Sequence, residues 1–338
     1  MIGIGIVGFG YWGPNLARNF METPGAKVVC VSDLRPDRLA LAQSRYPSIK
    51  TTTDARELIR DPSVDAVVIA TPVNSHYDLG MAALKEKKHL LMEKPLAASA
   101  TQARQLIEES ERQKRVLLVD HTFTYTSAVR KMRDLVISGA LGEIYYYDSV
   151  RINLGLFQHD VNVIWDLAVH DLSIMDFVLG LRPTAVSATG ISHVPGKPEN
   201  IAYLTCFFDR PVIAHVHVSW LAPVKVRRTM LGGSTKMIMY DDIEPSEKIR
   251  VYDKGISTKN DPESIHKMLI QYRTGDMWAP HLDATEALKV EALHFIKAIE
   301  EQRALTAESE SSLRIVETLE AATQSIEKRG QPVELGMR

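Results

Sequence analysis

The sequence predicts an α/β protein with a doubly wound parallel sheet in its N-terminal third and an antiparallel sheet in the domain that follows. Up to about residue 120, short apolar segments alternate with helical patterns, an order typical of parallel βαβ units. The first apolar segment runs directly into a glycine-rich turn. After residue 180, strand-like segments follow one another with tight turns, which favours antiparallel pairing. We therefore expect two domains, residues 1–120 and 121–338.

Size and composition fit an ordinary globular protein and exclude several classes. The chain has 338 residues with 40 basic and 42 acidic side chains, a net charge of −2 that gives no reason to expect nucleic acid or an anionic membrane as partner. No apolar segment approaches the roughly 20 residues that span a bilayer. Two cysteines, Cys30 and Cys206, cannot build a disulfide framework or a thiolate zinc site. Without a basic segment before the first apolar run, we expect a cytoplasmic protein.

The first element, Ile2–Val7, reads as a strand buried on both faces, and it leads into a G-x-G-x-x-G turn. In this motif the first glycine permits the tight turn, the second lets the backbone approach a pyrophosphate, and the third lets the following helix pack close to the sheet. The phosphates would lie at the positive end of that helix. The turn alone also fits a glycine-rich loop of another α/β protein. The expected cofactor-binding residues here are Gly8, Phe9, Gly10, Tyr11, Trp12 and Gly13.

A second apolar segment, Lys27–Val31, ends in Ser32 and Asp33. Asp33 lies twenty residues after Gly13, where an acid that binds the adenosine ribose is expected. A carboxylate there accepts hydrogen bonds from both ribose hydroxyls and repels a 2′-phosphate, so NAD is the expected cofactor. Arg35 keeps NADP open, because a guanidinium can receive that phosphate. A solvated turn residue is the structural alternative for Asp33.

The N-terminal sheet then continues with alternating elements. These are a helix at Arg38–Tyr46, a strand at Ile49–Thr53, a helix at Ala55–Arg60 capped by Asp54, a strand at Asp65–Ala70, a helix at His76–Lys87 capped by Ser75, a strand at His89–Met92, a helix at Ser99–Lys114 and a strand at Val116–Val119. Thr71 and Pro72 end the third long strand, and Pro72 keeps its carboxyl end open, where ligands bind in such folds.

The second half changes pattern. It predicts a helix at Ser127–Ser138, a strand at Glu143–Asn153, a helix at Val163–Leu179 closed by Gly180, strands at Thr184–Ile191, Ala202–Phe208, Val212–Trp220, Lys225–Leu231 and Lys236–Tyr240, an irregular stretch over 253–280, and helices at Ala284–Gln302 and Ala307–Lys328.

Two stretches outside the glycine turn carry candidate chemistry. Glu93 and Lys94 follow a predicted strand on the cofactor edge, and a charged turn ending in Pro95 is the structural alternative. Asp166 and His170 stand at i and i+4 on one face of an apolar helix. Burying either group requires a partner, so they either satisfy each other or face a ligand.

The order of these motifs resembles that of the glucose–fructose oxidoreductase/inositol dehydrogenase (Gfo/Idh/MocA) family, over essentially the whole chain. The motifs are the glycine turn, Ala70-Thr71-Pro72 followed by His76, Lys88-His89 leading into Glu93-Lys94-Pro95, and Asp166-x-x-x-His170. The resemblance implies a Rossmann domain joined to an α/β domain whose large, mostly antiparallel sheet serves oligomer contacts, in a homodimer or homotetramer. It also implies NAD(P)-dependent oxidation or reduction of a sugar, inositol or nucleotide sugar, with a nucleotide-sugar 3-dehydrogenase as one variant.

Carried over by position, Lys94 and His170 would transfer protons, Asp166 would bind and orient sugar hydroxyls, and Glu93 would lie near the nicotinamide ribose. Many relatives begin the second domain with an arginine-containing segment, whereas this chain has His121–Tyr125, so substrate contacts from that segment are open. The resemblance adds the cofactor contacts Thr71, Pro72 and His76. The expected substrate contacts are Tyr125, Arg151, Lys225 and Arg227.

Other interpretations of these residues and of the function stay open at this point. Lys225 and Arg227 share a predicted strand face that either meets a phosphate or is solvated. His215 and His217 also share a face, but without matching cysteine or acidic ligands we expect no metal. Some relatives use bound NAD transiently to cleave glycosides, and a dinucleotide-binding regulator can keep the fold without catalysis.

Overall fold

The computed structural model describes residues 1–155, 161–258 and 270–336, which form two compact units. Residues 1–126 and 285–317 make up unit 1, and residues 127–284 and 318–338 make up unit 2. The chain therefore returns to unit 1 after building most of unit 2. Part of the stretch 253–280, predicted to be irregular, lies outside the described residues.

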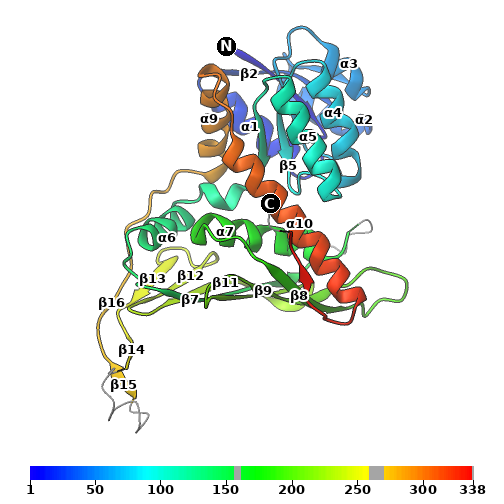
Figure 1. The fold of residues 1–338 in the computed structure, drawn as a ribbon. Helices are drawn as coiled ribbons and strands as arrows, with labels where there is room; N and C mark the ends of the chain where they lie inside the picture. Colours follow the sequence, from blue (N-terminus) through cyan, green and yellow to red (C-terminus); the bar gives the residue numbers. More distant parts are fainter. Residues whose placement is uncertain (156–160, 259–269, 337–338) are drawn as a thin grey trace. The chain divides into compact units, whose positions relative to one another are not determined.

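Unit 1 is built on a six-stranded sheet in the order β3-β2-β1-β4-β5-β6, and all neighbouring strands are parallel (Figure 1). Its strands are β1 (Ile2–Val7), β2 (Ala26–Ser32), β3 (Lys50–Thr52), β4 (Ala66–Ile69), β5 (His89–Glu93) and β6 (Leu117–Asp120). The strand order reverses between β1 and β4, which is where doubly wound sheets bind ligands at the carboxyl ends of their strands.

Helices cover both faces of this sheet. They are α1 (Gly13–Glu22), α2 (Pro36–Arg45), α3 (Ala55–Arg60), α4 (His76–Lys85), α5 (Ala100–Arg112), α9 (Ala287–Glu300) and the first part of α10 (Thr306–Glu327), with short 3₁₀ turns η1 (Val73–Ser75) and η2 (Thr122–Tyr125). Asp54 caps α3 as predicted, by accepting from the Arg56 N–H at 2.8 Å. Ser75 does not cap α4, because its hydroxyl donates to the Pro72 carbonyl instead.

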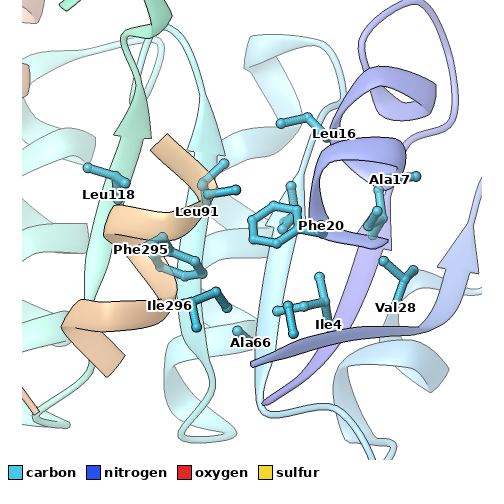
Figure 2. Close-up of a cluster of buried hydrophobic side chains, with 14 of the residues drawn as sticks. Ile4, Leu16, Ala17, Phe20, Val28, Ala66, Leu91, Leu118, Phe295 and Ile296 are labelled. Carbon is cyan, nitrogen blue, oxygen red and sulfur yellow. The ribbon is translucent and has the colours of Figure 1, made fainter. Parts of the chain in front are cut away.

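Helices α1 and α9 share one face of the sheet and bury the largest aromatic side chains of unit 1 there. Phe20 of α1 and Phe295 of α9 meet edge to face with ring centroids 6.2 Å apart. Figure 2 shows the cluster around them, which contains Ile4, Leu16, Ala17, Val28, Ala66, Leu91, Leu118 and Ile296. Apolar residues from position 4 to position 296 thus form one core.

Unit 2 is built on a nine-stranded sheet in the order β16-β13-β12-β11-β7-β10-β9-β8-β17. The strands are β7 (Ile144–Leu154), β8 (Ala185–Ile191), β9 (Ile201–Phe207), β10 (Ile213–Ser219), β11 (Leu221–Gly233), β12 (Met237–Asp241), β13 (Ile249–Tyr252), β16 (Met277–Trp278) and β17 (Val333–Glu334), and a separate ribbon pairs β14 (Gly255–Thr258) with β15 (Ile270–Arg273). Only β7 and β10 pair in parallel among the described strands of this sheet, which confirms the mostly antiparallel fold.

Helices α6 (Ser127–Ile137) and α7 (Val169–Leu179) lie against one face of this sheet (Figure 1). On β9 and β10 buried residues alternate with more exposed ones, as expected when one face packs on helices and the other does not. Large apolar side chains remain exposed on these strands and on β7: Tyr145, Tyr203, Phe207 and Ile213.

The helix predicted at Val163–Leu179 begins differently from the expectation. Residues Ile164–Ala168 form a π-helix, and α7 follows as a regular helix until Gly180 at φ 62°. The side chain of Asn162 accepts from the N–H groups of Ile164 and Trp165 and so satisfies the first turn. Single π turns are frequent at functional sites, and this one carries Asp166.

Candidate active site

The glycine turn in unit 1 has the three backbone properties that its pattern predicts. Gly8 has φ 97°, and a Cβ there would lie 2.4 Å from the Ala70 carbonyl oxygen. A Cβ on Gly13 would lie 2.1 Å from the carbonyl oxygen of Gly8, so α1 can begin there only without a side chain. At Gly10, by contrast, the nearest atom to an added Cβ is the Arg35 Nη2 at 3.6 Å. The turn therefore leaves a cradle at Gly10 that a side chain would fill.

The remaining residues of the turn divide by exposure. Phe9 is fully buried, so it can reach a cofactor only through its backbone. Tyr11 and Trp12 are partly exposed and meet edge to face. The first turn of α1 holds no acidic residue, so its positive end is free to attract an anion.

Asp33 ends β2 and faces this turn. Its Oδ2 accepts from the Phe9 N–H at 2.7 Å, and its Oδ1 accepts from the Arg35 N–H at 2.9 Å. The Nε of Arg35 lies 3.5 Å from the same Oδ1, and that side chain is half exposed. An ionised carboxylate accepts about four hydrogen bonds, so Asp33 keeps capacity for a ribose diol while it fixes the loop.

At the end of β4, Thr71, Pro72 and His76 hold two loops together. The Nε2 of His76 lies 2.9 Å from the Thr71 carbonyl, and its Nδ1 lies 2.9 Å from the Pro95 carbonyl. The ring is 1% exposed, and this burial lowers the pKa of His76 against the effect of the two carbonyls. The geometry gives His76 a positioning function, and direct cofactor contact by Thr71, Pro72 and His76 stays a prediction.

Behind Lys94 lies a cluster of three buried carboxyl groups that the sequence did not reveal. Glu93 ends β5 beside Asp120, its register partner on β6, and Glu291 comes from α9. The Lys94 N–H donates to Glu93 Oε2 at 3.1 Å, and the Thr122 N–H donates to Asp120 Oδ1. As an ionised carboxylate, Glu291 finds no donor among the described residues. Burial first, and the neighbouring Asp120 second, raise the pKa of Glu93 and of Glu291 well above the usual range. The cluster therefore retains protons next to Lys94.

Tyr125 stands at the end of η2. Its side chain is buried, and its hydroxyl lies 2.8 Å from the Nδ1 of His294 on α9. A substrate contact by Tyr125 stays a prediction.

In unit 2, the structure supplies a partner for Asp166. The indole Nε1–H of Trp220 donates to Asp166 Oδ2 at 3.0 Å, and Trp220 is itself 1% exposed. The buried indole thus fixes the position of the carboxylate. The sequence placed Trp220 at the end of a strand but gave no signal for this contact, because the two residues are 54 positions apart.

The next acid on α7, Asp171, anchors the helix to the sheet. Its Oδ2 accepts from the Arg151 Nε at 2.8 Å, its Oδ1 accepts from the Ser149 hydroxyl at 2.6 Å, and its carbonyl accepts from the Tyr147 hydroxyl at 3.0 Å. The Arg151 and Asp171 side chains are 3% and 2% exposed. This buried ion pair precludes sliding of α7 and so fixes where the adjacent His170 lies. A substrate contact by Arg151 stays a prediction, and the ion pair does not support it.

The two basic residues of the pair predicted on β11 have different surroundings in the structure. Arg227 pairs in register with Arg151 and donates to Asp242 Oδ2 at 3.1 Å. Lys225 lies in the irregular part of the strand, between Leu221 and Val226, and is exposed. Because Asp242 already neutralises Arg227, phosphate binding by the two residues stays a prediction with less support than the spacing alone gave it.

Lys94 belongs to unit 1, and Asp166 and His170 belong to unit 2. Over the ranges that the structure describes, no three histidine, cysteine or acidic side chains are placed to hold a metal ion. In the same ranges no helix combines the length and apolarity needed to cross a membrane.

Comparisons with known proteins match both parts of the chain. Residues 2–121 match the model of an oxidoreductase family with an NAD-binding Rossmann fold, and residues 129–239 match the GFO/IDH/MocA C-terminal domain. The myo-inositol 2-dehydrogenase of Thermotoga maritima is 28% identical over 199 residues, which are 55% of this chain and 58% of that protein. The NAD⁺-dependent scyllo-inositol 2-dehydrogenase of Bacillus subtilis is 28% identical over 55% of this chain and 56% of its own length. The chain thus spans little more than half the length of these two curated relatives.

Among solved structures, a levoglucosan dehydrogenase in complex with NADH and levoglucosan gives a TM-score of 0.83 at 18% identity, covering 99% of this chain and 100% of that one. At this identity the likeness establishes the fold of the chain and carries no conclusion about its substrate.

Proposed function

This chain belongs to the Gfo/Idh/MocA oxidoreductase family, whose N-terminal model describes an NAD-binding Rossmann domain, and we propose that it is an NAD-dependent dehydrogenase of a cyclic polyol or sugar. The proposed reaction moves hydride between a secondary alcohol carbon and the nicotinamide. Two curated relatives named as inositol dehydrogenases support this substrate class.

The observation that carries the proposal is the fixed carboxylate of Asp166, one turn before His170. Trp220 holds one oxygen of that carboxylate, and the Arg151–Asp171 ion pair fixes the helix that carries the imidazole. A carboxylate accepts hydrogen bonds from the hydroxyl groups of a polyol. An imidazole with a reference pKa of about 6.5 takes a hydroxyl proton near neutral pH.

The residues of unit 1 fit the cofactor. Gly10 leaves room for a pyrophosphate, α1 offers its positive end, and Asp33 presents a carboxylate to an adenosine ribose. Bound nicotinamide supplies the hydride acceptor or donor, and the protein supplies placement and charge. Lys94 would stabilise the alkoxide that develops as His170 removes the proton.

Steady-state assays with a panel of inositols, anhydrosugars, free sugars and nucleotide sugars test this function. A dehydrogenase accumulates NADH with its substrate, a glycoside-cleaving relative releases the aglycone without net NADH, and a regulator does neither. Absence of NADH formation across the panel, together with NAD binding, would refute the dehydrogenase assignment.

We also propose that the open face of the unit 2 sheet joins copies of the chain into a homodimer or homotetramer. Tyr203, Phe207 and Ile213 leave 42%, 37% and 48% of their surface exposed on two neighbouring strands. Scattered apolar residues are normal on surfaces, but a contiguous group marks an interface. Light scattering of the wild type and of Phe207→Asp measures this; a monomeric wild type would refute it.

A further inference from the structure

A cavity of about 710 Å³ opens at the amino edge of the unit 1 sheet. It lies where β5 begins at His89 and β6 begins at Leu117, between the end of α5 and the turn that joins α9 to α10. The glycine turn and Lys94 follow the carboxyl ends of the strands, on the other edge of the same sheet. The proposed catalytic function therefore makes no use of this cavity.

Basic side chains dominate the charged lining of the cavity. Lys114, Arg115 and Arg303 line it together with one acidic residue, Glu111. The Nε of Arg303 lies 3.5 Å from Glu301 Oε2, whereas Lys114 forms no ion pair within the described ranges. An excess of positive charge on a concave surface raises the local concentration of anions.

Two hydrogen-bond donors face each other in the wall of the cavity. The Nδ1 of His89 accepts from the Val116 N–H at 3.0 Å, so the proton of the neutral ring resides on Nε2. That Nε2 lies 3.3 Å from Nη1 of Arg115, which is also a donor. Burial and the nearby Arg115 lower the pKa of His89 to about 4, so the ring is neutral at pH 7. Two N–H groups that face each other cannot form a hydrogen bond, so each of them requires an acceptor.

We propose that this cavity binds an organic phosphate, with its phosphate group accepting hydrogen bonds from Arg115 and from His89 Nε2. The phosphate would give Arg115 a hydrogen-bond acceptor. The Nε of Arg115 is also buried and has no hydrogen-bond partner among the described residues. Lys114 adds a further positive charge at the same wall. Phosphate suits such a site because it accepts several charge-assisted bonds at once.

The volume of the cavity favours an organic ligand over the free ion. Pockets for metabolite-sized ligands measure roughly 300–1,000 Å³, and a water molecule occupies about 30 Å³ of liquid. A lone phosphate would leave most of the 710 Å³ to solvent, whereas a sugar phosphate or a nucleoside monophosphate would fill it.

The dipole of α5 explains part of the positive charge at the cavity, but it does not explain the two donors that face each other. Basic residues at a helix C-terminus interact favourably with its dipole, and Lys114 and Arg115 follow the end of α5. Arg112, in the last turn of the same helix, serves that purpose through its ion pair with Glu109 and does not line the cavity. It therefore provides a matched control.

Titration calorimetry with saturating NADH, which blocks the pyrophosphate site, tests the proposal. The probes are inorganic phosphate, glucose 6-phosphate and adenosine monophosphate. We expect at least one organic phosphate to bind more tightly than inorganic phosphate. Arg115→Gln should weaken that binding by about ten- to a hundred-fold, because a hydrogen bond to a charged group is lost. Arg112→Gln removes the same charge outside the cavity and should leave the affinity unchanged.

A second substitution distinguishes the loss of a phosphate contact from a folding defect. His89→Asn keeps an acceptor for the Val116 N–H and removes the Nε2 donor, so it should also weaken organic phosphate binding while NADH affinity stays at the wild-type value. Equal affinity in wild type and Arg115→Gln, or no binding of any probe at millimolar concentration, would overturn the proposal. Inorganic phosphate binding as tightly as the organic probes would overturn the assignment to an organic ligand. None of these readouts depends on turnover.

Discussion

Alanine substitutions at Gly10 and Gly13 should separate cofactor binding from folding. An added Cβ at Gly10 meets only the Arg35 Nη2 at 3.6 Å, an ordinary contact. The φ of Gly10 also lies outside the positive range that disfavours alanine. Gly10→Ala should therefore fold normally and gain about 0.4–1 kcal/mol by restricting the unfolded chain. At Gly13 the added Cβ would lie 2.1 Å from the Gly8 carbonyl oxygen, so the helix must shift.

The two substitutions should change different quantities, NADH affinity for Gly10→Ala and stability for Gly13→Ala. Gly10→Ala fills the cradle and pushes a pyrophosphate away from the backbone N–H groups. Losing two hydrogen bonds to a charged group, at about 1.5–3 kcal/mol each, weakens NADH binding by roughly 10²–10⁴-fold. Gly13→Ala should destabilise by about 1–3 kcal/mol or more, in the range of overpacking. In a domain of this size each kcal/mol shifts Tm by roughly 2–4 °C.

Two measurements on each variant are sufficient: thermal denaturation without cofactor, and NADH titration followed by fluorescence. Gly10→Ala should keep or slightly raise its Tm and lose NADH binding, and Gly13→Ala should lose Tm first. NADH binding of wild-type strength in Gly10→Ala would refute the pyrophosphate assignment. A Gly13→Ala protein as stable as wild type would refute the interpretation that the third glycine allows the helix to pack close to the sheet.

Three further predictions concern single side chains. Asp33→Ser should weaken NAD binding and narrow its advantage over NADP, because Arg35 stays beside the turn; titration of both cofactors measures this, and an unchanged preference would contradict the ribose assignment. Lys94→Ala and His170→Ala should each lower kcat by about 10²–10⁴-fold with NAD affinity nearly intact, and near wild-type turnover in either variant would remove that residue from the mechanism. Glu291→Gln should alter the pH dependence of stability. Since burial raises the folded-state pKa of Glu291, its contribution to stability is fully present below the unfolded pKa of about 4.3 and is lost as pH rises through the folded pKa. The Gln side chain does not titrate, so the Tm of the variant minus the Tm of wild type should increase from pH 4 to pH 8. A difference that stays constant with pH would show that the carboxyl does not stay protonated.

Local patterns predicted the parallel sheet well, because each strand of a doubly wound sheet is a continuous apolar run. The glycine turn and Asp33 were also predictable, since one βαβ unit of about 30 residues contains them all. The strands β13 and β16, at one side of the unit 2 sheet, were missed because strands of four and two residues show too little alternation to recognise. The π turn was missed because helical periodicity does not distinguish a wider turn from a regular one.

Contacts between distant residues account for the rest. The spacing of Lys225 and Arg227 predicted a common basic face, but it could not show that Asp242 pairs with Arg227 or that the strand register shifts next to Lys225. The carboxyl cluster of Glu93, Asp120 and Glu291 draws on three elements and depends on α9 joining unit 1, which no local pattern predicts.

The return of the chain to unit 1 has a consequence for biosynthesis. Phe295 and Ile296 complete the core around Phe20, yet the ribosome makes them about 170 residues after the last strand of that sheet. At roughly 5–20 residues per second, the nascent sheet waits on the order of ten seconds or more with part of one apolar face uncovered. A chaperone that binds exposed apolar segments would therefore engage the face of β1, β4 and β5 during translation. For the same reason, a fragment ending after β6 would aggregate, and an excised nucleotide-binding unit must carry residues 285–317 fused to its end.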